Sequence, residues 1–183
     1  MKTISASWIA AGVALLALGA SSMTTARDTT AAPSLGDAAA RVSVELGAYD
    51  QMTEVKRLRG SARRTTEQQI HALATWLARQ AEPRVPAGER LRITLVDVDL
   101  AGDYEPGRSF ELQDVRIVKE LYAPRIEIRW TFEDAQGRVL REGGDALRDP
   151  GFMTGSGAID SDPLRHEKRM LRDWLRRVLP QAE

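Results

Sequence analysis

A strand whose periodicity changes part-way, within the stretch Leu91–Gly107, constrains the fold of this chain more than any other feature. In its first half apolar and polar residues alternate, which indicates a β-strand with one buried face; the apolar residues are Leu91, Ile93 and Leu95. At Val96 the pattern slips by one residue, and the apolar positions become Val96, Val98 and Leu100. Because such a slip turns the following side chains to the opposite face, we predict a bulge or an abrupt twist near Leu95–Val96.

The same stretch ends in an acidic loop that contains glycine. Four carboxylates fall within nine residues, namely Asp97, Asp99, Asp103 and Glu105. Carboxylates on a flexible loop can bind Ca²⁺, but the spacing and the late bidentate glutamate of an EF-hand are missing. The alternatives are a solvated strand edge, or ion pairs with arginines on neighbouring strands; the candidate arginines are Arg92, Arg116 and Arg129. We favour these alternatives and expect neither a bound metal nor a cofactor.

The remaining periodicities predict an α+β domain. The cleanest alternation is at Arg125–Glu133, which is typical of a strand with one face on the core and one in water, with Trp130 in the core. Other strands are predicted at residues 41–46, 113–121 and 138–149, with a turn at 134–137, a bend or bulge at Gly143–Gly144 and an irregular segment at 47–60. Helices are predicted at 61–80, ended by Pro83 and Pro86, and from Asp162–Pro163 to Pro180, with Trp174 in the core. The order β-α-β-β-β-β-α describes a mainly antiparallel sheet with two helices packed on one face.

The N-terminal residues predict export. Lys2 precedes an apolar run of 13 residues, Trp8–Ala20, and small residues follow, which is the pattern of a secretory signal peptide. The run is shorter than the roughly 20 residues that a membrane span needs. We predict a signal peptide at 1–22, a disordered linker at 23–40 and a single domain at 41–180, located in the periplasm and without a transmembrane span in the mature chain.

No complete catalytic motif is present in the sequence. There is no cysteine, so an exported chain of this kind is held by its core alone. The histidines are His71 and His166, on different predicted helices, and Met170 stands where a zinc peptidase helix needs its second histidine. Ser156 lies between two glycines but lacks the full nucleophile elbow. The sequence therefore favours a protein that is not an enzyme.

The charge balance argues against a dedicated nucleic-acid binder, because 26 basic and 26 acidic residues give a formal net charge of zero. Cations nevertheless gather in the segment Lys56–Arg64 and on one face of the last helix, at Arg165, Lys168 or Arg169, Arg172 and Arg176. Charged faces of this kind are usually only solvated. They also fit an acidic partner protein or a phosphate-rich surface of the cell envelope.

Five short motifs are the most distinctive local sequences of the chain. They are L-x-D-x-D-L-A-G at Leu95–Gly102, P-G at Pro106–Gly107, D-V-R-I-V-K at Asp114–Lys119, P-R-I at Pro124–Ile126 and L-R-H-E-K-R-M-L-R-D-W at Leu164–Trp174. Together they resemble a domain-of-unknown-function family of small exported proteobacterial proteins, over about residues 42–175. That family has no assigned activity, so the resemblance implies a periplasmic location and one compact domain, but no catalytic residue.

These observations predict a non-catalytic binding or accessory module of the cell envelope. The expected partner is an envelope protein or an anionic envelope surface. The alternative is a metal-dependent hydrolase that uses the carboxylates of Asp97, Asp99 and Asp103. The predicted binding residues lie on the acidic loop and on nearby arginines: Asp97, Asp99, Asp103, Glu105, Arg116 and Arg125.

Overall fold

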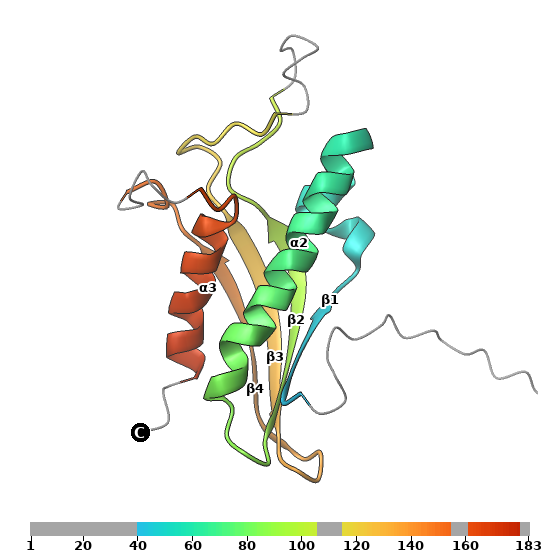
Figure 1. Ribbon diagram of the computed structural model, residues 1–183, viewed down its shortest axis with the longest axis vertical. Coiled ribbons are helices and arrows are strands. Elements are labelled where there is room, and N and C mark those ends of the chain that lie inside the picture. Colours follow the sequence, from blue (N-terminus) through green and yellow to red (C-terminus); the bar gives the residue numbers. More distant parts are fainter. Residues whose placement is uncertain (1–39, 106–114, 155–160, 180–183) are drawn as a thin grey trace, which may run out of the picture. The chain divides into compact units, whose positions relative to one another are not determined.

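The computed structural model describes residues 40–105, 115–154 and 161–179 (Figure 1). The predicted signal peptide at 1–22 and the predicted linker, apart from residue 40, lie outside the described residues. Within the described ranges, no helix combines the length and the apolar character that crossing a membrane requires.

The chain folds as an α+β unit, as predicted. Its elements in order are β1 (Val42–Leu46), the 3-10 helix η1 (Tyr49–Gln51), α1 (Thr53–Arg57), α2 (Gly60–Ala81), the 3-10 helix η2 (Glu82–Arg84), β2 (Arg90–Asp99), β3 (Arg125–Glu133), β4 (Val139–Arg148) and α3 (Arg165–Val178). The four strands form one sheet in the order β1-β2-β3-β4. β1 runs parallel to β2, and the other pairs are antiparallel. A parallel pair needs a long crossover, which α2 supplies, and α2 and α3 cover the same face of the sheet (Figure 1).

The predicted change of phase in β2 is a β-bulge. Leu95 pairs with Ile128 and Asp97 pairs with Glu127, so Val96 is the extra residue. Before the bulge the buried residues are Leu91, Ile93 and Leu95, and after it they are Val98 and Leu100. The bulge therefore keeps apolar side chains in the core on both sides of the slip.

The core lies between the apolar face of the sheet and the two long helices. Its buried side chains include Ile70, Leu73 and Leu77 from α2, Leu171, Trp174 and Leu175 from α3, and Ile93, Ile128 and Phe132 from the sheet. Trp174 is fully buried, as predicted, and Trp130 is partly buried and packs against the core. Both indole Nε1 atoms donate to the Oδ2 atom of Asp145, at 3.1 Å from Trp130 and 3.0 Å from Trp174. One carboxylate on β4 thus satisfies two indole groups that burial would otherwise leave without acceptors.

The hairpin between β3 and β4 has the predicted turn at residues 134–137, but the predicted bend at Gly143–Gly144 is wrong. β4 is continuous through both glycines, and the register shifts instead between Phe132 and Glu133. Gly143 lies opposite Trp130, and a Cβ atom there would come within 2.6 Å of the indole. Glycine is needed at this position because the indole ring occupies the space that a larger side chain would fill. The glycines that predicted a bend therefore reflect a packing requirement.

Two segments have a different secondary structure from the one predicted. The segment 47–60, predicted as irregular, contains η1 and α1. The predicted strand at 113–121 is wrong in its described part, residues 115–121, where only an isolated bridge joins Ile117 to Asp103. β2 already has a neighbour on each side, β1 and β3, so no edge of this strand is free for a further partner.

The last helix begins slightly later than its cap signal predicts. α3 starts at Arg165, and Asp162 stabilises the turn before it, because its Oδ1 atom accepts from the Leu164 backbone N–H at 2.9 Å. The first long helix is within one residue of its predicted bounds and ends at Ala81, before Pro83.

Candidate functional site

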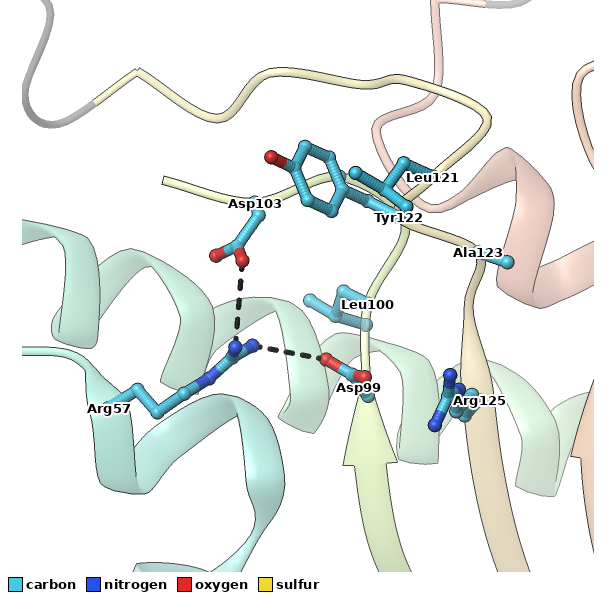
Figure 2. A pocket seen from close by; sticks show the side chains of 9 residues that line it. Arg57, Asp99, Leu100, Asp103, Leu121, Tyr122, Ala123 and Arg125 are labelled. Atoms are coloured by element: carbon cyan, nitrogen blue, oxygen red, sulfur yellow. Dashed lines mark hydrogen bonds and ion pairs between the residues drawn. The ribbon is translucent and has the colours of Figure 1, made fainter. Parts of the chain in front are cut away.

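A pocket of about 320 Å³ lies where β2 runs into the acidic loop. The end of α1, the end of β2, the start of β3 and the segment 121–123 surround it (Figure 2). Its principal side chains are Arg57, Asp99, Asp103, Leu121, Tyr122 and Arg125. The bulge at Val96 contributes to this site, because it sets the direction in which Asp99 leaves the sheet.

The guanidinium of Arg57 lies between two carboxylates. Its Nη2 atom is 3.3 Å from Oδ1 of Asp99, and its Nη1 atom is 3.5 Å from Oδ2 of Asp103 (Figure 2). Both distances are long for charge-assisted hydrogen bonds, which are usually about 2.7–2.9 Å. The side chain of Arg57 is 47% exposed, and ion pairs of this kind contribute little to stability. Arg57 is therefore positioned between Asp99 and Asp103 without being bound tightly to either carboxylate.

The surroundings of Asp99 shift the pKa of its carboxyl group. Burial raises its pKa, and the nearby carboxylate of Glu54 raises it further, while the guanidinium groups of Arg57 and Arg125 act in the opposite direction. A carboxylate in such surroundings gains from any additional positive charge that comes close to it. The pocket is therefore suited to a cationic group placed against Asp99.

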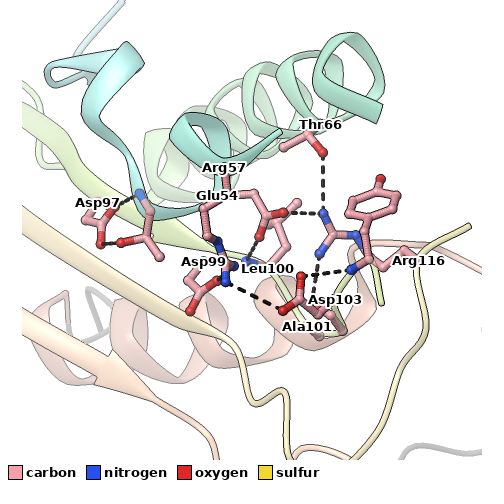
Figure 3. A network of polar contacts seen from close by, with 12 residues as sticks. Glu54, Arg57, Thr66, Asp97, Asp99, Leu100, Ala101, Asp103 and Arg116 are labelled. Atoms are coloured by element: carbon pink, nitrogen blue, oxygen red, sulfur yellow. Dashed lines mark hydrogen bonds and ion pairs between the residues drawn. The ribbon is translucent and has the colours of Figure 1, made fainter. Parts of the chain in front are cut away.

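Behind the pocket, a buried ion pair holds the loop in place (Figure 3). Nη2 of Arg116 lies 2.5 Å from Oε1 of Glu54, and Nη1 donates to the carbonyl oxygen of Gly102 at 3.0 Å. The other oxygen of Glu54 accepts from the backbone N–H of Leu100 at 3.0 Å. Gly102 has φ +90°, and a Cβ atom there would lie 2.8 Å from the carbonyl oxygen of Ile117. Arg116 is thus a residue that shapes the pocket wall rather than one that lines it.

Glu167 fixes the same loop from the side of α3. Its Oε1 atom accepts from the backbone N–H of Ala101 at 2.6 Å, and its side chain is almost fully buried. Burial raises the pKa of Glu167. Together with Glu54, this residue ties two successive backbone N–H groups after β2 to two different helices. The sequence hints at this role, because Glu167 stands at helical spacing between Leu164 and Leu171, on the apolar side of the helix.

The structure brings three of the six predicted binding residues into one pocket: Asp99, Asp103 and Arg125. Asp97 lies apart from them, because its carboxylate accepts from the backbone N–H and the hydroxyl of Thr53 at 2.6 and 2.7 Å. Glu105 is paired with Lys119 and accepts from the hydroxyl of Tyr122 at 3.2 Å. The acidic loop pairs with an arginine, but with Arg57 of the basic segment Lys56–Arg64 rather than with the expected Arg92, Arg116 or Arg129. Arg116 pairs with Glu54, and Arg92 pairs with Glu133.

Several site residues carry no distinctive pattern in the sequence. Glu54 and Tyr122 carry no local signal, because each acquires its role from residues more than ten positions away in the chain. Arg57 was visible only as one member of a basic segment, with nothing to distinguish it from its neighbours.

The geometry gives the hydrolase alternative no metal centre in the described ranges. Asp97 is bound to Thr53, and Asp99 and Asp103 share Arg57. In the part of the chain that the structure describes, no three His, Cys, Asp or Glu side chains are grouped as a metal site would require. His166 is buried edge-on against Phe152, with ring centres 4.8 Å apart, and burial lowers its pKa.

Comparison with known families places the chain. A family model described as "Protein of unknown function (DUF3016)" matches residues 40–177. The chain belongs to this family. Its match covers the whole sheet and nearly all of α3, so the pocket at the end of β2 lies within the family domain. A comparison with curated proteins finds no match.

Proposed function

We propose that this member of the family is an exported, periplasmic binding module of the cell envelope, and that the pocket at the end of β2 is its recognition site. The observation that carries the proposal is the loose position of Arg57 between Asp99 and Asp103. The N-terminal pattern of Lys2 followed by an apolar run of 13 residues supports export.

The pocket chemistry favours a partner segment with charges of both signs. An incoming lysine or arginine replaces Arg57 beside Asp99 and Asp103, and an incoming carboxylate then pairs with the released Arg57 or with Arg125. Guanidinium groups suit this exchange because they bind carboxylates in a bidentate manner. A volume of about 320 Å³ is at the low end for ligand sites, so it fits one or two side chains of a partner better than a large cofactor.

The rim of the pocket supports a protein partner. Leu121 lines the pocket and is 78% exposed, and the same segment carries Val115 and Val118 at 42% and 37% exposure. Exposed apolar side chains beside a charged centre are typical of protein–protein contact sites, where they exclude water from the polar contacts.

Export is tested by fractionation of cells that express the full chain with a C-terminal tag. The expected result is a periplasmic protein whose N-terminus, read by mass spectrometry, begins at Met23. A variant without residues 2–22 serves as the control and should remain in the cytoplasm. An uncleaved chain in the wild-type sample would contradict the proposed location.

Recognition is tested with a photo-crosslinking amino acid in place of Leu121, in the exported chain. The expected result is a defined adduct that is lost in the double variant Asp99→Asn/Asp103→Asn. The adduct should persist in Arg129→Ala, because Arg129 is an exposed residue of β3 outside the pocket. Circular dichroism of each variant confirms folding. Equal crosslinking by the double variant, or no adduct from the parent chain, would rule out the pocket as the recognition site.

A further inference from the structure

A row of cations runs along the outward face of α3. Arg165, Lys168, Arg172 and Arg176 follow one another at three- and four-residue steps, and Leu171, Trp174 and Leu175 occupy the buried face of the same helix. The eleven steps from Arg165 to Arg176 correspond to about 16 Å of helix.

Trp76 of α2 lies beside this row. Nζ of Lys168 and the guanidinium carbon of Arg172 are each 5.8 Å from the centre of the Trp76 ring, within the range of cation–π contacts. α2 and α3 lie side by side on the sheet (Figure 1), so the half-buried indole and the cations belong to one surface. An indole beside long basic side chains is the combination that suits a membrane–water interface.

Two of the four cations in this row have carboxylate partners, and the other two are Arg165 and Arg172. On α3 itself, Glu167 is buried and Asp173 is paired with Arg176. Asp162 lies 2.5 Å from Lys168 at the start of the helix. Arg172 and Arg177 have no carboxylate partner among the described residues, and both are exposed.

The opposite face of the sheet is different. There acids and bases alternate, as in the pair formed by Arg92 and Glu133 at 3.1 Å. On α3 six cations stand against two acids, so the zero net charge of the chain hides an excess of positive charge on this helix.

We propose that the outward face of α3, together with Trp76, docks on an anionic phospholipid surface through the phosphate groups of the lipids. A membrane is favoured over an acidic protein because, among the described residues of this face, the one large apolar side chain beside the cations is Trp76, which is only partly exposed. None of the large apolar side chains exposed in the described residues lies on α2 or α3; they are Val115, Val118, Leu121, Val139, Leu140 and Met153. The proposal does not depend on the pocket at the end of β2.

The test is co-sedimentation with vesicles of phosphatidylcholine, with and without phosphatidylglycerol. The protein is the chain without residues 1–22, which retains every core residue that the structure describes, from Val42 to Leu179. Binding is expected only to the vesicles that contain phosphatidylglycerol, and it should weaken as salt is added.

The decisive variant is Arg172→Glu/Arg176→Glu/Arg177→Glu. Because each basic residue near an anionic membrane contributes on the order of a fivefold gain in binding, removal of three cations should weaken binding at least roughly 100-fold. The matched control is Arg90→Glu/Arg129→Glu/Arg148→Glu on the strands, which changes the net charge equally and should retain most of the binding. Equal losses in the two variants would overturn the proposal, because they would show that net charge alone drives binding.

Two further measurements separate the membrane from other anionic partners. The fluorescence of the bound wild-type protein should shift to shorter wavelength, and the shift should shrink in Trp76→Phe if the indole enters the interface. Soluble polyglutamate serves as a competitor and should displace the protein from vesicles only weakly. Displacement by polyglutamate at an equal charge concentration would show that the surface fits an acidic protein instead.

Discussion

Glu167 is an acid that the fold places almost entirely out of water. One oxygen accepts from the Ala101 backbone N–H, and the other has no hydrogen-bond partner among the described residues. Such a group holds the loop after β2 while disfavouring its own charged form. The stability of the domain should therefore depend on pH through this residue.

The sign of that dependence follows from the raised pKa. The unfolded chain loses the Glu167 proton near the ordinary value of 4.5, and the folded chain retains it to higher pH. Between these two values the folded state binds more protons, so the free energy of unfolding decreases as pH rises. Above the pKa of Glu167 in the folded state, the buried charged carboxylate destabilises the domain by its full amount.

Glu167→Gln should remove this decrease, because the amide oxygen still accepts from Ala101 but carries no charge. Urea unfolding at a series of pH values measures the effect. The variant should gain stability relative to the wild type as pH rises above 4.5, whereas Glu127→Gln on the exposed side of β3 should follow the wild type. A difference between wild type and Glu167→Gln that stays constant with pH would contradict the assignment.

Gly143 is required for side-chain packing rather than for a turn of the backbone. A Cβ atom at this position would lie 2.6 Å from Cζ2 of Trp130, so Gly143→Ala forces the indole to move. We expect a loss of about 1–3 kcal/mol in the free energy of unfolding, measured in urea. Gly144→Ala is the matched control, since its Cβ meets only the Ile128 carbonyl oxygen at 3.5 Å, and it should change stability by less than about 0.5 kcal/mol. Similar losses in both variants would indicate a general strand effect.

At the scale of elements, α1 depends on β2. Asp97 accepts from the backbone N–H and the hydroxyl of Thr53, the first residue of the helix, so a carboxylate from the sheet takes the place of a local N-cap. A helix of only five residues has little stability of its own. The position of Arg57 at the end of α1, and with it the pocket, rests on this contact.

Asp97→Ala should therefore cost about 0.5–2 kcal/mol of stability, measured by urea unfolding. Thr53→Ser keeps both donors and should remain close to the wild type. The crosslinking experiment at Leu121 should also weaken in Asp97→Ala, because Arg57 is no longer held beside Asp99. Unchanged stability in this variant would show that α1 forms without the contact from β2.

At the scale of the molecule, the core formed by the described residues lies between Val42 and Leu179. A chain that begins at residue 40 should melt within about 2 °C of one that begins at residue 23, as measured by circular dichroism. A chain that ends at residue 161 should not fold cooperatively, because it lacks the buried Leu171, Trp174 and Leu175 of α3. A large loss of stability on removal of residues 23–39 would show that this segment contributes to the folded domain.

The sequence by itself determined the elements whose signals are local. Alternation gave β3, helical spacing gave α2 and α3, and the slip at Val96 gave the bulge, because each pattern reports which face of one element is buried. The sequence also predicted half of the candidate site, because an unusual density of charged residues is visible in it. These residues are Asp99, Asp103 and Arg125.

Only the tertiary structure decided which of those charges meet. The first residue of α1 donates to Asp97 of β2, and β2 is paired with β1 and β3, which leaves residues 115–121 no place beside it. Arg57 meets Asp99 across more than forty residues of chain. Such contacts depend on how elements pack against one another, and the periodicity of a single element carries no information about the partner it meets.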